Sequence, residues 1–185
     1  MSAVGVVLAG GRGSRLGGDK ATVELDGVAL LLYPLRALAA VTPAQAVVAK
    51  RDTQLPELPS GVATWHEPDA PRHPLTGVMH ALRAARGQPV LCCAVDLPLL
   101  DAATLRRLLD ADDGRHACVV PRVDGRLEPL CTLWHPWSLG TLDRIPPGLA
   151  MREVVAALDP LEIDFTNPRP FTNVNAPEDL LTIRT

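Results

Sequence analysis

The chain has 185 residues, of which 47% are hydrophobic and 21% charged, close to an average folded domain. A formal net charge of -3 argues against a nucleic-acid groove, which normally leaves a basic face. No apolar run reaches the roughly 18 residues that a membrane span needs. We therefore expect a single domain over residues 1–185, cytoplasmic and binding neither nucleic acid nor membrane.

Short apolar runs alternate with helical patterns through the first two thirds of the chain. Strands are expected at residues 4–8, 46–49, 62–65, 90–95 and 117–120, and helices at 30–40, 76–86 and 105–109. Asp101 is a plausible N-cap for the third helix. Strands that are buried on both faces form continuous apolar runs, so the pattern predicts a mainly parallel sheet covered by helices.

The last third predicts a small antiparallel excursion. Asp124-Gly125 has hairpin-turn chemistry and precedes an apolar run at 130–134. A helix at about 149–158, a strand at 161–165 and a helix at 177–183 follow. The expected fold class is a three-layer, Rossmann-like α/β domain with a mostly parallel sheet.

A glycine-rich loop follows the first strand at residues 8–20. Five glycines lie between Gly10 and Gly18, and Arg12, Arg15 and Lys20 add positive charge. Glycine permits positive φ and a close approach of the backbone to a ligand, so the combination predicts a polyphosphate site. A solvated surface loop is the alternative, but so many glycines cost conformational entropy that needs a purpose.

The loop departs from two common phosphate-binding motifs. In the P-loop pattern Asp19 stands where lysine is required, and in the dinucleotide fingerprint Leu16 stands where the third glycine belongs. The backbone N–H groups of residues 8–11, which are Leu8, Ala9, Gly10 and Gly11, are the expected ligand contacts.

The stretch Leu-Ala-Gly-Gly at 8–11, with a compact Gly-Gly-Asp-Lys at 17–20, resembles the molybdenum cofactor guanylyltransferases of the nucleotidyltransferase superfamily. Pro-Leu-Thr-Gly at 74–77, Val-Asp-Leu-Pro at 95–98 and Asn-Val-Asn-Ala-Pro-Glu at 173–178 resemble further family segments in the same order. The resemblance implies a nucleotidyltransferase fold and Mg²⁺-dependent transfer of GMP from GTP to the phosphate of a molybdopterin-type acceptor, releasing pyrophosphate. It also fits transient contacts with other cofactor-biosynthesis proteins.

Asp96 ends a strongly apolar run, so its carboxylate is expected at the carboxyl edge of the sheet, where open α/β sheets bind ligands. It is the candidate Mg²⁺ ligand; capping of the next helix is the alternative, for which Asp101 is better placed. The resemblance makes Arg15 and Lys20 catalytic cations that offset charge moving toward pyrophosphate. Surface salt bridges are the alternative for both cations.

The resemblance also assigns Glu67 and Gly77 to the nucleotide, with a solvated loop acid as the alternative for Glu67. Asn173 and Asn175 are assigned to the acceptor, on the same side of an extended segment. For Asn175 the alternative is a helix cap with Glu178. Gly10 favours guanine, because cytidylyltransferase relatives carry alanine there.

Two positions depart from the family pattern, and both concern the expected recognition of the base. His73 replaces a glycine before Pro-Leu-x-Gly, and Lys50 follows the second strand where some relatives carry asparagine. Alternatives therefore stay open: CTP with molybdopterin, GTP with another phosphorylated small molecule, or a GTP-binding regulatory protein without turnover. The presence of both Lys20 and Asp96 argues against the regulatory protein, because GTP binding without turnover does not need a metal-binding carboxylate.

The cysteines and histidines do not form a recognisable metal motif. Cys92, Cys93, Cys118 and Cys131 lack C-x-x-C spacing, and all lie in apolar runs. We interpret them as small buried hydrophobes. The histidines are scattered, and none is assigned a metal.

Overall fold

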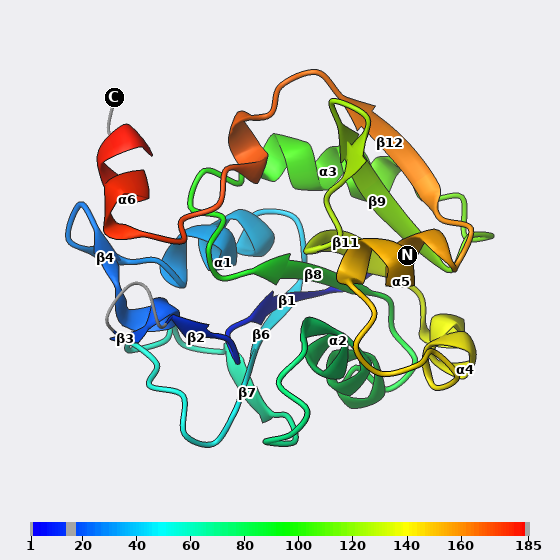
Figure 1. Cartoon of the computed structure of the whole chain (residues 1–185), viewed down its shortest axis with the longest axis horizontal. Helices are drawn as coiled ribbons and strands as arrows, with labels where there is room; N and C mark the ends of the chain where they lie inside the picture. Colours follow the sequence, from blue (N-terminus) through cyan, green and yellow to red (C-terminus); the bar gives the residue numbers. More distant parts are fainter. Residues whose placement is uncertain (1, 14–17, 184–185) are drawn as a thin grey trace.

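A computed structural model describes residues 2–13 and 18–183 (Figure 1). The strands are β1 (Val4–Leu8), β2 (Arg12–Gly13), β3 (Gly18–Asp19), β4 (Glu24–Leu25), β5 (Val28–Ala29), β6 (Ala44–Ala49), β7 (Ala63–His66), β8 (Val90–Ala94), β9 (Cys118–Val123), β10 (Arg126–Leu127), β11 (Cys131–Trp134) and β12 (Leu161–Phe165). The helices are α1 (Leu32–Ala39), α2 (Pro74–Ala84), α3 (Ala102–Ala111), α4 (Leu139–Leu142), α5 (Met151–Ala156) and α6 (Pro177–Ile183).

The main sheet has the order β10-β9-β11-β8-β1-β6-β7, with β12 alongside β9. Strands β8, β1, β6 and β7 are mutually parallel. From β1 the chain adds β6 and then β7 on one side, and it returns to add β8 on the other side. This reversal between β1 and β8 is a topological switch point, where the loops after the strands diverge and open a crevice.

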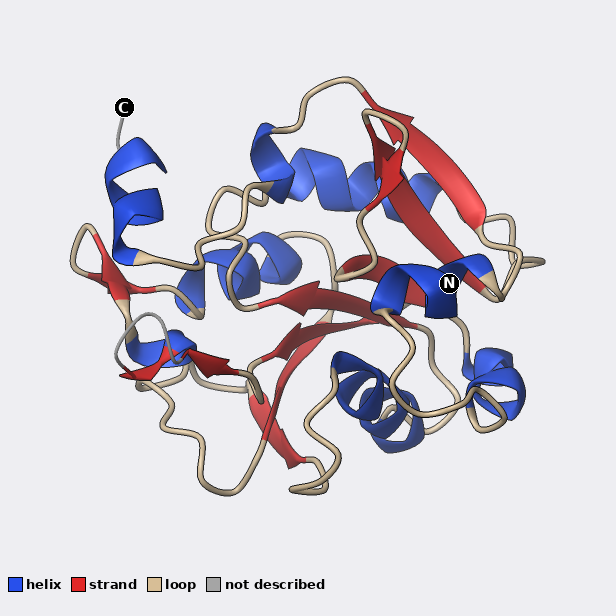
Figure 2. Cartoon of the chain, in the orientation of Figure 1, coloured by secondary structure: helices blue, strands red, loops and turns tan. Residues whose placement is uncertain are grey.

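Helices cover both faces of the sheet, as Figure 2 shows. One core cluster packs α1 and α3 against Val7, Val47 and Leu91, and the other packs α2, α4 and α5 against Val6 and Val48. Neighbouring residues of one strand therefore belong to opposite cores, as the alternation of side chains along a strand requires. The predicted three-layer α/β fold with a mostly parallel sheet is confirmed.

The antiparallel excursion is also confirmed. β9 and β10 form a hairpin whose turn residues Asp124 and Gly125 have φ of 48° and 74°, the left-handed pair of a type I′ turn. β11 then runs antiparallel to both β8 and β9. A second hairpin of this kind, β4–β5 with Asp26 and Gly27 at φ of 53° and 74°, was missed by the sequence reading.

Helix bounds differ from expectation mainly at the ends. Asp101 caps α3 as predicted, since its carboxylate accepts a hydrogen bond from the Thr104 N–H, but α3 continues to Ala111. α2 begins two residues earlier than expected, because His73 caps it through Nδ1 and proline is tolerated at the first helical position. α5 is shorter than expected.

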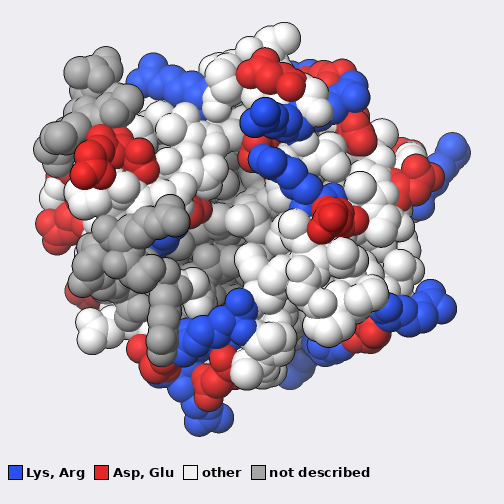
Figure 3. Space-filling view, in the orientation of Figure 1, with Lys and Arg blue, Asp and Glu red and all other residues white. Residues whose placement is uncertain are grey.

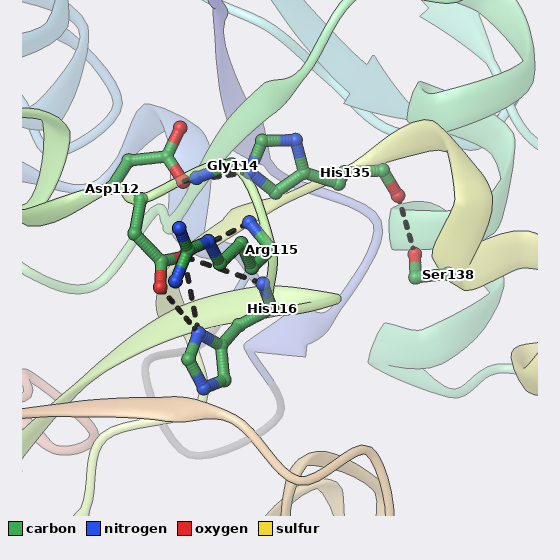
Figure 4. A network of polar contacts seen from close by, with 7 residues as sticks. Asp112, Gly114, Arg115, His116, His135 and Ser138 are labelled. Carbon is green, nitrogen blue, oxygen red and sulfur yellow. Dashed lines mark hydrogen bonds and ion pairs between the residues drawn. The ribbon is translucent and has the colours of Figure 1, made fainter.

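Two histidines stabilise the connections at the amino ends of the parallel strands (Figure 4). His135 is fully buried, with Nε2 2.9 Å from Asp112 Oδ1, and its carbonyl accepts from Ser138 Oγ. His116 Nδ1 lies 3.1 Å from Asp113, and backbone and side-chain donors lower the pKa of that aspartate to about 2. The His135–Asp112 contact joins the α3–β9 turn to the end of β11, and the His116–Asp113 contact lies within that turn.

All four cysteines are free and buried, as interpreted from the sequence. Burial raises the pKa of Cys118 to about 12 and that of Cys92 further, so these thiols are protonated at neutral pH. Within residues 2–13 and 18–183, no helix is both long and apolar enough to span a membrane.

Candidate active site

A cavity of about 400 Å³ lies at the carboxyl edge of the sheet. It is formed where the chain leaves β1, β6, β7 and β8, on both sides of the switch point. Figure 3 shows this face hollowed at its centre, with Lys and Arg side chains on the upper and lower borders of the hollow. Its lining residues are Leu8, Gly10, Gly11, Lys20, Lys50, Glu67, Arg72, His73, Pro74, Gly77, Ala94, Val95, Asp96 and Leu130.

Lys20 and Asp96 meet at the centre of this edge. Lys20 Nζ donates to Asp96 Oδ2 at 2.7 Å and to Asn175 Oδ1 at 2.8 Å. The Lys20 and Asp96 side chains are 16% and 13% exposed, so the pair is sheltered but within reach of a ligand. Three distant segments of the sequence are thus joined at one ammonium group.

Asp96 has one oxygen left for a ligand. Its Oδ1 is buried and accepts no hydrogen bond from a residue that the structure describes. The backbone holds the residue in place, because the Val174 N–H donates to the Asp96 carbonyl at 2.9 Å. In the described part of the chain, no cluster of three His, Cys, Asp or Glu side chains could hold a metal ion. A single hard carboxylate oxygen fits Mg²⁺, which takes its other ligands from phosphates and water.

Glu67 and Lys50 form a second pair deeper in the cavity. Glu67 Oε1 lies 3.3 Å from Lys50 Nζ, and the two side chains are 6% and 1% exposed. Burial raises the pKa of Glu67, and Lys50 and Arg72 partly oppose this shift. The alternative of a solvated loop acid at Glu67 is therefore wrong.

The glycines of the cavity act through close packing. A Cβ at Gly10 would lie 2.0 Å from Glu67 Oε1, and one at Gly77 would lie 3.4 Å from Glu67 Oε2. Neither Gly10 nor Gly11 has positive φ. Gly10 thus leaves room for the Glu67 carboxylate, which a side chain at this position would displace.

The expected row of backbone donors at residues 8–11 is interrupted. Leu8, Gly10 and Gly11 line the cavity, but Ala9 is buried and its N–H donates to the Val48 carbonyl at 2.8 Å. Ala9 therefore stabilises the sheet and has no free N–H for a ligand. Arg15 lies outside the described residues.

Asn173 and Asn175 have different surroundings. Asn175 reaches Lys20, whereas Asn173 lines a neighbouring cavity of about 300 Å³ together with Arg152. At the start of α6, the Asp179 carboxylate accepts from the backbone N–H groups of Asn175 and Ala176. The Asn175 side chain is in contact with Lys20, which lines the larger cavity.

Lys50 was noticed in the sequence only as a departure from a family pattern. Lys50 could be linked to the site by its position directly after the buried strand β6, because the strands beside β6 also end at the cavity. A lysine at that position is not distinguishable by sequence from a solvated loop residue.

A family model described as the MobA-like NTP transferase domain matches residues 5–161. The chain belongs to this family. It is also 33% identical to the molybdenum cofactor guanylyltransferase of Cereibacter sphaeroides over 97% of this chain and 94% of that protein. The resemblance stated from the sequence is confirmed, and as a MobA-like NTP transferase the chain is a nucleotidyltransferase.

Solved structures share the fold of this MobA-like domain. Molybdopterin-guanine dinucleotide biosynthesis protein A of Archaeoglobus fulgidus aligns with a TM-score of 0.70 at 18% identity, covering 97% of this chain and 96% of that one. The manganese complex of Rv0371c from Mycobacterium tuberculosis aligns with a TM-score of 0.75 at 18% identity, covering 99% and 98%. At such identities the likeness shows the fold alone.

Proposed function

We propose that this nucleotidyltransferase transfers GMP from GTP to the terminal phosphate of a molybdopterin-type acceptor. An acceptor phosphate oxygen attacks the α-phosphorus of GTP in line, a new P–O bond forms, and the bond to the β-phosphate oxygen breaks with release of pyrophosphate. No general base is needed, because a phosphate monoester with a second pKa near 6 is largely dianionic at neutral pH.

The nucleotide is assigned to the larger cavity. Glu67 accepts hydrogen bonds from the base, Gly77 leaves room beside that carboxylate, and Gly10 and Gly11 let the phosphates approach the backbone. A carboxylate suits guanine, whose N1–H and exocyclic amine are adjacent donors. The name of the Cereibacter sphaeroides relative supports the same base.

The reacting phosphates are assigned to the Lys20–Asp96 pair. Lys20 offsets the charge that moves onto pyrophosphate, and its bond to Asp96 Oδ2 leaves Oδ1 free to hold Mg²⁺. When bound there, Mg²⁺ supplies Lewis-acid polarisation of the phosphate oxygens. The manganese bound in the Mycobacterium tuberculosis structure supports a divalent ion. Arg15 is proposed as a second cation.

The acceptor is assigned to the neighbouring cavity. Asn173 and Arg152 line it, and Leu130 lines both cavities, so an acceptor there lies close to a nucleotide in the larger one. Asn175 accepts from Lys20, which lines the larger cavity. This arrangement brings two anions together in a sheltered space, which is most of what phosphoryl chemistry requires.

The unpartnered Asp96 Oδ1 beside Lys20, at the switch point of the sheet, is the observation that carries the proposal. It also favours turnover over simple binding, since binding GTP does not require a buried carboxylate oxygen left without a partner.

Pyrophosphate release with each of the four ribonucleoside triphosphates, Mg²⁺ and molybdopterin tests the proposal. We expect release with GTP only, and none when molybdopterin is omitted. Release with CTP but not GTP would contradict the guanylyl assignment. GTP binding without any release would favour the regulatory alternative, and release with GTP and another phosphate monoester alone would change the acceptor.

A further inference from the structure

Lys50 is buried although it carries a charge. It follows β6 directly, its side chain is 1% exposed, and Nζ donates to the Pro68 carbonyl at 2.5 Å. The same Nζ lies 3.3 Å from Glu67 Oε1. A buried ammonium is tolerated only where it is paired and hydrogen-bonded, and both partners here belong to the segment that follows β7. Lys50 thus fixes the segment that carries Glu67.

The two oxygens of Glu67 are in different environments. Oε1 faces Lys50 Nζ and the open side of Gly10, while Oε2 is buried and has no hydrogen-bond partner among the described residues. The residue is only 7% exposed and lines the larger cavity. A buried carboxylate oxygen without a partner is costly, so the arrangement favours a ligand that brings donors to it.

Lys50 lines the cavity, but its side chain is only 1% exposed. Its Nζ is enclosed and already has two oxygen partners, in contrast to Lys20, which is 16% exposed at the centre of the site. Any influence of Lys50 on a nucleotide therefore passes through Glu67. This makes Lys50 a positioning residue.

We infer that Lys50 determines base selection by holding Glu67 Oε1, which directs Oε2 toward a base with two adjacent N–H donors; this inference rests on the proposed function. Guanine has that edge. In adenine and cytosine the amine lies beside a ring acceptor, and in uracil the N–H lies between two carbonyls. A site built around a buried acceptor discriminates strongly, because a wrong base leaves it unpaired.

Steady-state kinetics with GTP and CTP for the Lys50→Gln, Glu67→Gln and double variants test the inference. For Lys50→Gln we expect KM for GTP to rise about 10- to 100-fold, with kcat within about threefold and the GTP preference reduced accordingly. Once Glu67→Gln is present, adding Lys50→Gln should change the preference no further. Arg83→Gln is the control, since Arg83 pairs with exposed Asp143.

Gly10→Ala provides an independent variant if Lys50→Gln does not fold. Its methyl group would displace Glu67 Oε1 while leaving Lys50 in place, so the same loss of GTP preference is expected. The inference is overturned if folded Lys50→Gln or Gly10→Ala protein keeps the wild-type preference, or if the Lys50 and Glu67 effects simply add. Wild-type protein without a preference for GTP would instead refute the proposed function itself.

Discussion

Two lysine–carboxylate pairs line the same cavity, yet their environments differ. Lys20 and Asp96 are 16% and 13% exposed, and Asp96 keeps one oxygen without a partner at the centre of the site. Lys50 and Glu67 are 1% and 6% exposed. The more accessible pair can act on a reacting phosphate, whereas the enclosed pair can only shape what fits beside it. In our proposal, a lysine and a carboxylate therefore serve the chemical step in one place and base selection in the other.

The largest expected effect comes from Asp96→Asn, which removes the charge at the accessible pair. We expect turnover to fall on the order of 10³-fold while the melting temperature stays within a few degrees. Pyrophosphate release and thermal unfolding are the measurements. Asp101→Asn is the matched control, because asparagine also caps a helix and should keep full activity. An active Asp96→Asn variant would remove Asp96 from the mechanism.

Lys20→Gln is expected to lower kcat on the order of 10²-fold, since the charge developing on pyrophosphate loses its cation. KM for GTP should change less than kcat, which separates this pair from the Lys50–Glu67 pair. Single-turnover and steady-state rates are the measurements, with Arg106→Gln on the exposed side of α3 as control. A variant that changes only KM would show that both pairs serve binding.

The pH dependence of KM distinguishes the enclosed pair. Burial raises the pKa of Glu67 above 4.5, against the opposing charges of Lys50 and Arg72; Lys20, His73 and Asp96 line the same cavity. In the proposed site the ionised carboxylate is the stronger acceptor for guanine, so KM for GTP should rise as pH falls through that raised pKa. Glu67→Gln should remove this rise of KM at low pH. A rise that persists in the variant would mean that another group titrates.

The same pKa shift predicts a stability change in the protein without nucleotide. Because the folded state favours the protonated acid, the stabilisation is complete below pH 4.5 and is lost as pH rises through the folded pKa. We expect the free energy of unfolding, measured by chemical denaturation across this pH range, to decrease with pH in the wild type and to lack this contribution in Glu67→Gln. Equal slopes would contradict the shift.

The smallest effect is expected at an exposed pair. Arg83 Nη2 and Asp143 Oδ1 are 2.5 Å apart, but both side chains are more than half exposed. Asp143→Asn should change the unfolding free energy by less than about 1 kcal/mol and leave GTP kinetics unaltered. A change in GTP kinetics would mean that an exposed charge also influences the site.

The strands and their order of appearance could be read from the sequence because buried parallel strands are continuous apolar runs. β1 and β12 have the predicted bounds, and Asp96 follows β8 at the carboxyl edge as expected. The β4–β5 hairpin was missed because each of its strands has only two residues, too few for a periodic pattern. The contact of the Asn175 side chain with Lys20 could not be read from the sequence, because the two residues lie 155 positions apart.

The sequence by itself determined the α/β layers, the family and the identity of Lys20, Asp96 and Glu67 as candidates, since local periodicity and short motifs carry that information. Only the tertiary structure decided which oxygen of each carboxylate is free, why residue 10 is glycine, and that Lys50 belongs with Glu67. These depend on contacts between the ends of separate strands. Such contacts arise from sheet order and burial, which no local stretch of the chain encodes.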